Sequence, residues 1–143
     1  MPEPMTPETL TAQGWTRLDI DGFSRVSGGL WTRGRLPELE LGFLSGQQHV
    51  NGHMSTVHGG MLLTLADVSL GYAVIQQLGA MNCVTAQLQT QFISAAKVGE
   101  FIVCRPQVLR QSSDLVFLRG LIAVGERTVA SVDGIWKILK PRG

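Results

Sequence analysis

Residues 59–75 read Gly59-Gly-Met-Leu-Leu-Thr-Leu-Ala-Asp67-Val-Ser-Leu-Gly-Tyr-Ala-Val-Ile75. Wound into a helix, this stretch is apolar on almost every side, which predicts a buried helix. We expect this helix to run from about Gly60 to Gln77 and to stop near Gly79, a residue type suited to a C-terminal cap. A carboxylate at its centre costs several kcal/mol unless it is paired or hydrogen-bonded. Asp67 is therefore the first candidate functional residue.

The sequence on either side of this helix alternates with the period of two that is typical of strands. One strand is predicted at 39–43, followed by a polar loop, and four more are predicted after the helix at 83–93, 101–109, 115–124 and 128–139. One long helix with an antiparallel sheet is a two-layer α+β arrangement. Such a sheet covers one side of the helix only, so the other side, or the sheet edge, needs a partner subunit. We therefore expect a homo-oligomer.

Length and composition predict a single domain. A chain of 143 residues suffices for one core, and we expect an N-terminal arm over 1–35, with a short helix at 7–13, before the main domain at 36–143. The net charge of +1 gives no reason to expect nucleic acid or an anionic membrane as a partner. No signal peptide is recognisable, and no apolar stretch is expected to reach the ~18 residues of a membrane span. With two cysteines outside any metal-type spacing, we expect a cytoplasmic protein.

The helix start carries two glycines, Gly59 and Gly60. They leave backbone N–H groups uncovered at the positive end of the helix dipole, where an anion or a developing oxyanion is stabilised. Close packing of the helix start against a strand is the alternative explanation for such a pair. Both interpretations stay open on the glycines alone.

The spacing of Gly59 and Asp67 limits how they can act together. Eight residues of helix separate them by about 12 Å, whereas an oxyanion donor and a nucleophile or base must both lie about 3 Å from one reacting carbonyl. If both belong to one site, Asp67 must face the Gly59 end of another subunit's helix. The alternative is a structural Asp67, bonded to a buried hydroxyl or backbone group.

Further candidates surround this helix. The Thr85 hydroxyl, on the first strand after the helix, is placed to bond Asp67 or a water, although a strand threonine is commonly structural. Asn51 is a candidate donor to a substrate carbonyl, although loop asparagines are commonly turn formers. His58 is expected to shape the helix start through hydrogen bonds. His49, His53 and His58 are not expected to bind zinc, because no cysteine or second carboxylate joins them.

The stretch from Asn51 through His58-Gly59-Gly60 to Asp67, with Thr85 and the turn 92–100, resembles the hotdog-fold acyl-CoA thioesterases of the phenylacetate-pathway (PaaI-like) type. The resemblance covers about residues 36–140. It implies an acyl-CoA substrate with an aromatic or a medium to long acyl chain, and two protomers that pair to form two sites. A homotetramer, as a dimer of dimers, is common in the family.

The resemblance also assigns roles. Gly59 would polarise the thioester carbonyl with help from Asn51, although Asn51 lies one position earlier than the family pattern. Asp67 of the facing subunit would act as nucleophile or general base, with Thr85 positioning the water or the carboxylate. His58 and Gly60 would lie against the substrate, and no metal or redox cofactor is expected.

Two other functions compete with thioester hydrolysis. A non-catalytic acyl-CoA-binding or sensing protein on the same fold is the first alternative, although the first 35 residues show no helix-turn-helix pattern. A hotdog dehydratase or hydratase is the second. That chemistry uses a histidine paired with a carboxylate at one carbon centre, and no histidine accompanies Asp67 on its helix.

Overall fold

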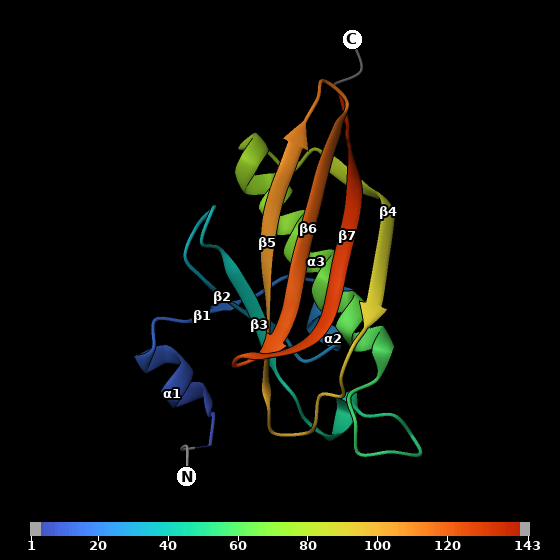
Figure 1. Cartoon of the computed structure of the whole chain (residues 1–143). Coiled ribbons are helices and arrows are strands. Elements are labelled where there is room, and N and C mark those ends of the chain that lie inside the picture. The colour runs from blue at the N-terminus through green and yellow to red at the C-terminus, as the bar shows by residue number, and fades with distance from the viewer. Residues whose placement is uncertain (1–3, 141–143) are drawn as a thin grey trace.

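The computed structural model describes residues 4–140 and consists of one long helix packed against one face of a sheet (Figure 1). The α+β hotdog arrangement predicted from the sequence is confirmed. The helices are α1 (Pro7–Ala12), α2 (Phe23–Val26) and α3 (Gly59–Leu78), with a 3-10 turn η1 (Gln47–His49). The strands are β1 (Thr16–Leu18), β2 (Leu30–Arg33), β3 (Glu40–Leu44), β4 (Cys83–Phe92), β5 (Phe101–Gln111), β6 (Leu115–Val124) and β7 (Arg127–Ile138).

The strands form a seven-stranded sheet in the order β1-β2-β3-β5-β6-β7-β4. All of its neighbouring strands are antiparallel. Strand β4, the first after the helix, crosses to the far edge and pairs with β7 alone. On its outer side, the backbone N–H and C=O groups of this ten-residue strand therefore have no neighbouring strand to pair with.

Helix α3 begins and ends where its sequence signals predict. His58 occupies the N-cap, and its ring accepts a hydrogen bond from the Gly60 N–H. At the other end Gly79 adopts a left-handed conformation with φ of 72°, which glycine adopts without steric cost. The predicted bounds therefore agree with the structure to within a residue.

The helix is buried on one side only within the protomer, as expected for a helix that a sheet covers on one side. Leu65, Ala66, Leu70 and Val74 face the sheet and are inaccessible to solvent. Asp67, on another side, is only half-buried. By length and hydropathy α3 also passes as a candidate membrane span, contrary to expectation. A core helix of a soluble protein meets the same criterion, so this alone places no membrane around the chain.

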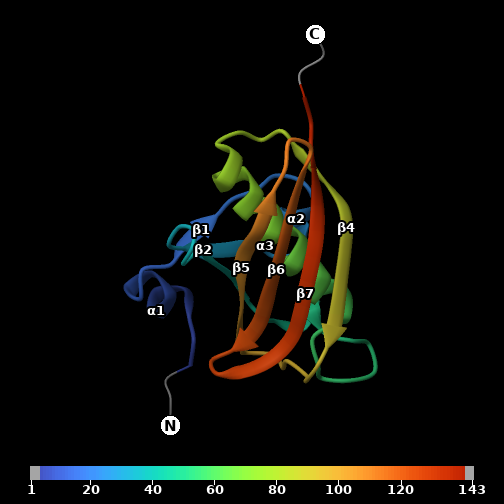
Figure 2. The same cartoon turned by 45° about the horizontal axis from the view of Figure 1, so that its top comes forward.

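The N-terminal segment adds two strands to the sheet and covers part of its other face. The short helix expected there is α1. Trp15 packs edge-on against Phe101, with ring centroids 4.8 Å apart, in a second core that also contains Leu10 and Trp31. This core lies on the face away from α3, because Ile102, between Phe101 and Val103, packs into the main core instead. Figure 2 shows α1 set apart from α3.

Candidate functional site

The start of α3 presents one unpaired backbone donor. His58 Nδ1 accepts the Gly60 N–H at 2.7 Å, and the N–H groups of Met61 and Leu62 both donate to the His58 carbonyl oxygen. The Gly59 N–H has no hydrogen-bond partner among residues 4–140. The structure therefore distinguishes the two glycines, since Gly60 serves the cap and Gly59 keeps a free donor at the positive end of the helix.

Asp67 lies in the middle of the same helix and contacts strand β4. The Thr85 hydroxyl donates a hydrogen bond of 2.6 Å to Asp67 Oδ1, as the sequence suggested. The register of β4 against β7 shifts between Thr85 and Gln87. Such a bulge re-aims the side chains beside it. No cation forms an ion pair with Asp67 within the described residues, so the carboxylate is oriented by a neutral hydroxyl.

Asn51 lies in the loop before α3, and its side chain is not hydrogen-bonded to Gly59 or Asp67 within residues 4–140. It lies in an exposed loop whose two sides are joined by an isolated bridge between Val50 and Val57 and by a bond of 2.8 Å from the Asn51 N–H to the Thr56 carbonyl. Across residues 4–140, the Asn51 side chain makes no hydrogen bond. The loop begins and ends beside the helix start, since the His58 N–H donates to the His49 carbonyl, and no hydrogen bond joins the Asn51 amide to Gly59 in the described residues.

His49 fastens the base of this loop. Its ring is almost fully buried, where Nδ1 accepts the Gly46 N–H at 3.0 Å and Nε2 donates to the Ser27 carbonyl at 2.5 Å. Its own carbonyl accepts the His58 N–H at 2.7 Å. His49 therefore has a structural role and links the N-terminal segment to the helix cap. No three His, Cys, Asp or Glu side chains between residues 4 and 140 are grouped to share a metal ion.

Phe92 is a further candidate site residue, for which no role is predicted from the sequence. A Cβ atom on Gly59 would lie 3.2 Å from the tip of the Phe92 ring, closer than ordinary van der Waals contact. The two residues border a cavity of about 370 Å³, which Leu62, Ile93 and the loop residues Ser94, Ala95 and Ala96 also line. Phe92 is 56% exposed. The sequence signal that points to Phe92 is an aromatic residue at the start of the turn 92–100, which carries part of the family resemblance.

Comparisons with known proteins identify the family. The family model described as "Thioesterase superfamily" matches residues 54–131. A putative esterase of Pseudomonas aeruginosa is 36% identical over 93 residues, which cover 64% of this chain and 69% of that protein. Acyl-coenzyme A thioesterase 13 of Mus musculus is 28% identical over 99 residues, or 68% of this chain and 70% of that protein.

Solved structures agree with this assignment. Zebra fish thioesterase superfamily member 2 superposes with a TM-score of 0.74 at 27% identity, covering 84% of this chain and 88% of that one. The Escherichia coli PaaI protein shares the fold, with a TM-score of 0.65 at 20% identity over 93% of this chain and 85% of that one. The family match and the relatives favour an enzyme over a non-catalytic binding protein or a dehydratase. The chain belongs to the thioesterase superfamily and is a thioester hydrolase with the hotdog fold.

Proposed function

We propose that the chain hydrolyses acyl-CoA thioesters at a site formed between two copies of itself. One copy supplies the Gly59 N–H, and the partner supplies the pair of Asp67 and Thr85. The observation that carries the proposal is the position of both features on one helix. Gly59 and Asp67 are eight residues apart in α3, or about 12 Å. A single carbonyl cannot contact both from one chain, whereas two antiparallel helices related by a two-fold axis would bring each Gly59 toward the other's Asp67.

The chemistry follows from these groups. The Gly59 N–H donates to the thioester carbonyl oxygen and stabilises the negative charge that develops there. The partner's Asp67 either attacks the carbonyl carbon or removes a proton from the attacking water. Collapse of the tetrahedral intermediate breaks the carbon–sulfur bond and releases the thiolate. On the first route water then hydrolyses an acyl-aspartate anhydride, and on both routes the products are a carboxylate and a thiol.

Two surfaces support pairing with a second copy. Strand β4 lies at the edge of the sheet and pairs on one side only. Consecutive residues along it are exposed, so both of its faces reach solvent, and Val84 among them is 48% exposed. The side of α3 that carries Asp67, Val68 and Tyr72 is only partly covered by the protomer's own sheet. A partner placed along β4 would cover this side of the helix and complete the site. We propose a dimer, with a dimer of dimers as the larger assembly.

The substrate class is proposed from the relatives and the chemistry together. One relative is named for acyl-coenzyme A, and a Bacillus halodurans protein of this fold was solved with CoA. A thioester is reactive enough for a carboxylate and one N–H donor to suffice without a catalytic triad. Aromatic and medium or long aliphatic acyl groups are the candidate substrates. A cytoplasmic location is part of the same proposal, since CoA esters are substrates inside cells.

A thiol-release assay over a panel of acyl-CoA esters tests the function. The parent protein should release thiol from at least one acyl class. Asp67→Asn should lose nearly all turnover while its circular dichroism and oligomeric state stay unchanged. Parental turnover by Asp67→Asn, or tight binding of acyl-CoA without thiol release by the parent, would contradict the proposal. In H₂¹⁸O, label found in the Asp67 carboxylate would identify the nucleophilic route, because only an acyl-aspartate anhydride that water attacks at the aspartyl carbonyl places solvent oxygen there.

A further inference from the structure

The direction of the Gly59 N–H is set by the residue before it. A peptide unit is planar and trans, so this N–H points away from the His58 carbonyl oxygen. That oxygen accepts the N–H groups of Met61 and Leu62 at 2.9 and 3.4 Å, and the backbone of His58 has φ of −61° and ψ of 136°. Whatever holds the backbone of His58 therefore also determines where the Gly59 N–H points.

His49 holds that backbone from outside the helix. Its carbonyl oxygen accepts the His58 N–H at 2.7 Å. The residue before His58, Val57, is held separately by a bond of 2.8 Å to the Ala96 carbonyl. The bond to His49 is therefore the last hydrogen bond that ties the chain to another segment before α3 begins.

The position of His49 is fixed in turn by its ring. The residue is 5% exposed, and its ring packs edge-on against Phe43 with centroids 4.9 Å apart. Nδ1 accepts the Gly46 N–H at 3.0 Å, which leaves the ring proton on Nε2, and Nε2 donates to the Ser27 carbonyl at 2.5 Å. Both ring nitrogens are thus occupied by backbone groups, so the ring orients the loop and does not act on a substrate as acid or base.

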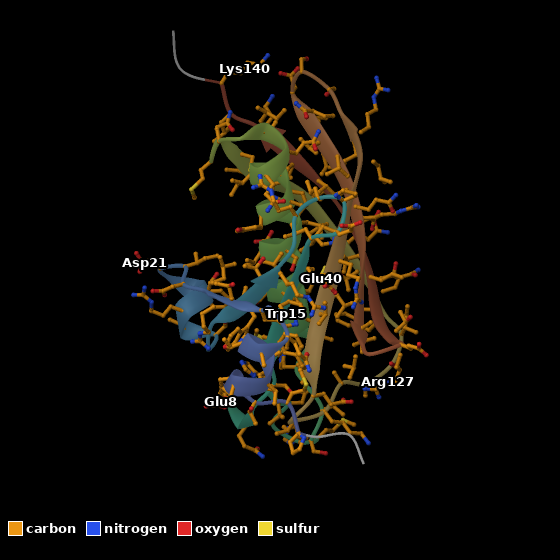
Figure 3. All side chains as sticks on the ribbon, turned by 90° about the vertical axis from the view of Figure 1, so that its left-hand side faces the viewer. Glu8, Trp15, Asp21, Glu40, Arg127 and Lys140 are labelled. Atoms are coloured by element: carbon orange, nitrogen blue, oxygen red, sulfur yellow. The ribbon has the colours of Figure 1, made fainter. Side chains whose placement is uncertain are left out.

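The bond to Ser27 joins the N-terminal segment to these contacts. Ser27 lies in the turn that ends α2, where its hydroxyl donates to the Ser24 carbonyl at 2.7 Å. The next residue, Gly28, has φ of 103°, and a Cβ atom there would lie 3.3 Å from His49 Nε2. Glycine therefore allows the turn both this conformation and its close approach to the ring. Figure 3 shows Asp21, earlier in the same segment, projecting away from the sheet.

We propose that His49 is a positioning residue for the Gly59 N–H and that its ring takes this position from Ser27 in the N-terminal segment. The inference rests on the proposed function, in which that N–H stabilises the charge on the thioester oxygen. Such a donor acts most strongly in the transition state. A shift of the donor should therefore lower kcat and leave KM nearly unchanged.

His49→Phe tests the role of the two ring bonds. It keeps a ring against Phe43 but neither accepts from Gly46 nor donates to Ser27. We expect kcat for acyl-CoA to fall about tenfold, since a misplacement of about 1 Å costs roughly a hundredfold, while KM stays close to the parental value. The assay is run well below the melting temperature of each variant, so that loss of folded protein does not lower the rate.

Two further variants separate the two ring bonds. The amide of His49→Gln lies near the position of Nε2 and still donates to the Ser27 carbonyl. The amide of His49→Asn lies near Nδ1 and still accepts the Gly46 N–H. His49→Gln should keep most of the parental kcat, whereas His49→Asn should behave like His49→Phe. The opposite order would overturn the role of Ser27.

The combination of His49→Phe with Gly59→Pro shows whether His49 acts through the Gly59 N–H. The double variant should be no slower than Gly59→Pro alone, because the donor that His49→Phe misplaces is already absent. Losses that multiply, or an unchanged kcat in His49→Phe, would overturn the positioning role while leaving hydrolysis intact.

Trp15→Phe is the control for lost stability without a misplaced donor. Trp15 packs against Phe101 in the second core, on the face of the sheet away from α3. Its truncation should lower the melting temperature and leave kcat and KM at the parental values. A fall in kcat as large as that of His49→Phe would overturn the inference. Failure of the parent to release thiol from any acyl-CoA would instead overturn the proposed function, before the variants are compared.

Discussion

The Thr85 hydroxyl donates to Asp67 Oδ1 at 2.6 Å and so joins the edge strand β4 to the centre of α3. A hydroxyl has one proton to donate, and this contact uses it on one carboxylate oxygen. The second oxygen, Asp67 Oδ2, has no hydrogen-bond partner in the part of the chain that the structure describes. The pair therefore holds the carboxylate in one orientation and leaves one oxygen available to a substrate or a water.

Removing the Thr85 hydroxyl should impair turnover more than folding. Thr85→Val keeps the size of the side chain but loses the hydrogen bond to a charged group, which is worth about 1.5–3 kcal/mol. We expect kcat to fall about tenfold or more while KM changes little, and the protein should stay folded with a melting temperature lowered by only several degrees. Thr85→Ser retains the hydroxyl and should keep most of the parental kcat. An equal kcat in Thr85→Val and the parent would refute the positioning role.

Proline at position 59 should remove the proposed oxyanion donor without disturbing the helix. Gly59 is the first residue of α3, where proline is well tolerated because that N–H has no intrahelical partner. The preceding His58 has φ of −61° and ψ of 136°, which a following proline accepts. Loss of one such donor should lower kcat about a hundredfold or more.

Gly59→Ala is the control for that substitution. It adds a Cβ atom 3.2 Å from the same Phe92 ring but keeps the N–H, so its loss of kcat should be much smaller. Similar losses in the two variants would mean that crowding against Phe92, and not the missing donor, causes the defect. Steady-state kinetics with thermal unfolding of both variants makes the comparison.

Much of this arrangement was predictable from the sequence, because the signals are local. The apolar run of 59–75, Gly79 after it and the alternation of the later strands predicted the bounds of α3 and of β4–β7 to within a few residues. Strands β1 and β2 were not predicted, since they are three and four residues long and depend on tertiary packing of Trp15 and Trp31. The position of Phe92 against Gly59 was also missed. It joins residues 33 positions apart, which no local pattern encodes.

A charge on the exposed edge of β4 should prevent self-association. Val84 is 48% exposed on that edge, and Val84→Lys would place an ammonium where the proposed partner packs, the device that natural edge strands use against pairing. We expect sedimentation velocity to show a monomer that keeps its circular dichroism spectrum and lacks activity. Val26→Lys, at an 80% exposed position on α2, should assemble like the parent. A Val84→Lys variant that assembles like the parent would argue against pairing through β4.

The buried thiol of Cys104 should make the fold sensitive to alkali. Burial raises its pKa from 9.0 to about 12, so the folded chain keeps the proton at pH values where the unfolded chain has lost it. The contribution of the protonated Cys104 thiol to the free energy of unfolding is therefore fully present below pH 9. It declines as the pH rises toward 12, by up to about 1.4 kcal/mol per pH unit.

Urea unfolding between pH 8 and 11 measures this effect of Cys104. Cys104→Ala should be less stable at pH 8, because a buried side chain is shortened, but its free energy of unfolding should fall less steeply with pH. Cys83, whose pKa burial also raises, is only half-buried, and Cys83→Ala should keep most of the parental slope. Parallel curves for the parent and Cys104→Ala would show that other groups cause the alkaline loss.

Mixing two inactive variants shows whether the two halves of one site come from different subunits. Asp67→Asn and Gly59→Pro protomers, co-expressed with different tags and purified as mixed dimers, would hold one site with both defects and one site with neither. We predict that the mixed dimer regains about half of the parental kcat per dimer, although each variant alone is nearly inactive. Mixed dimers that are as inactive as the Asp67→Asn and Gly59→Pro homodimers would contradict a site shared between subunits.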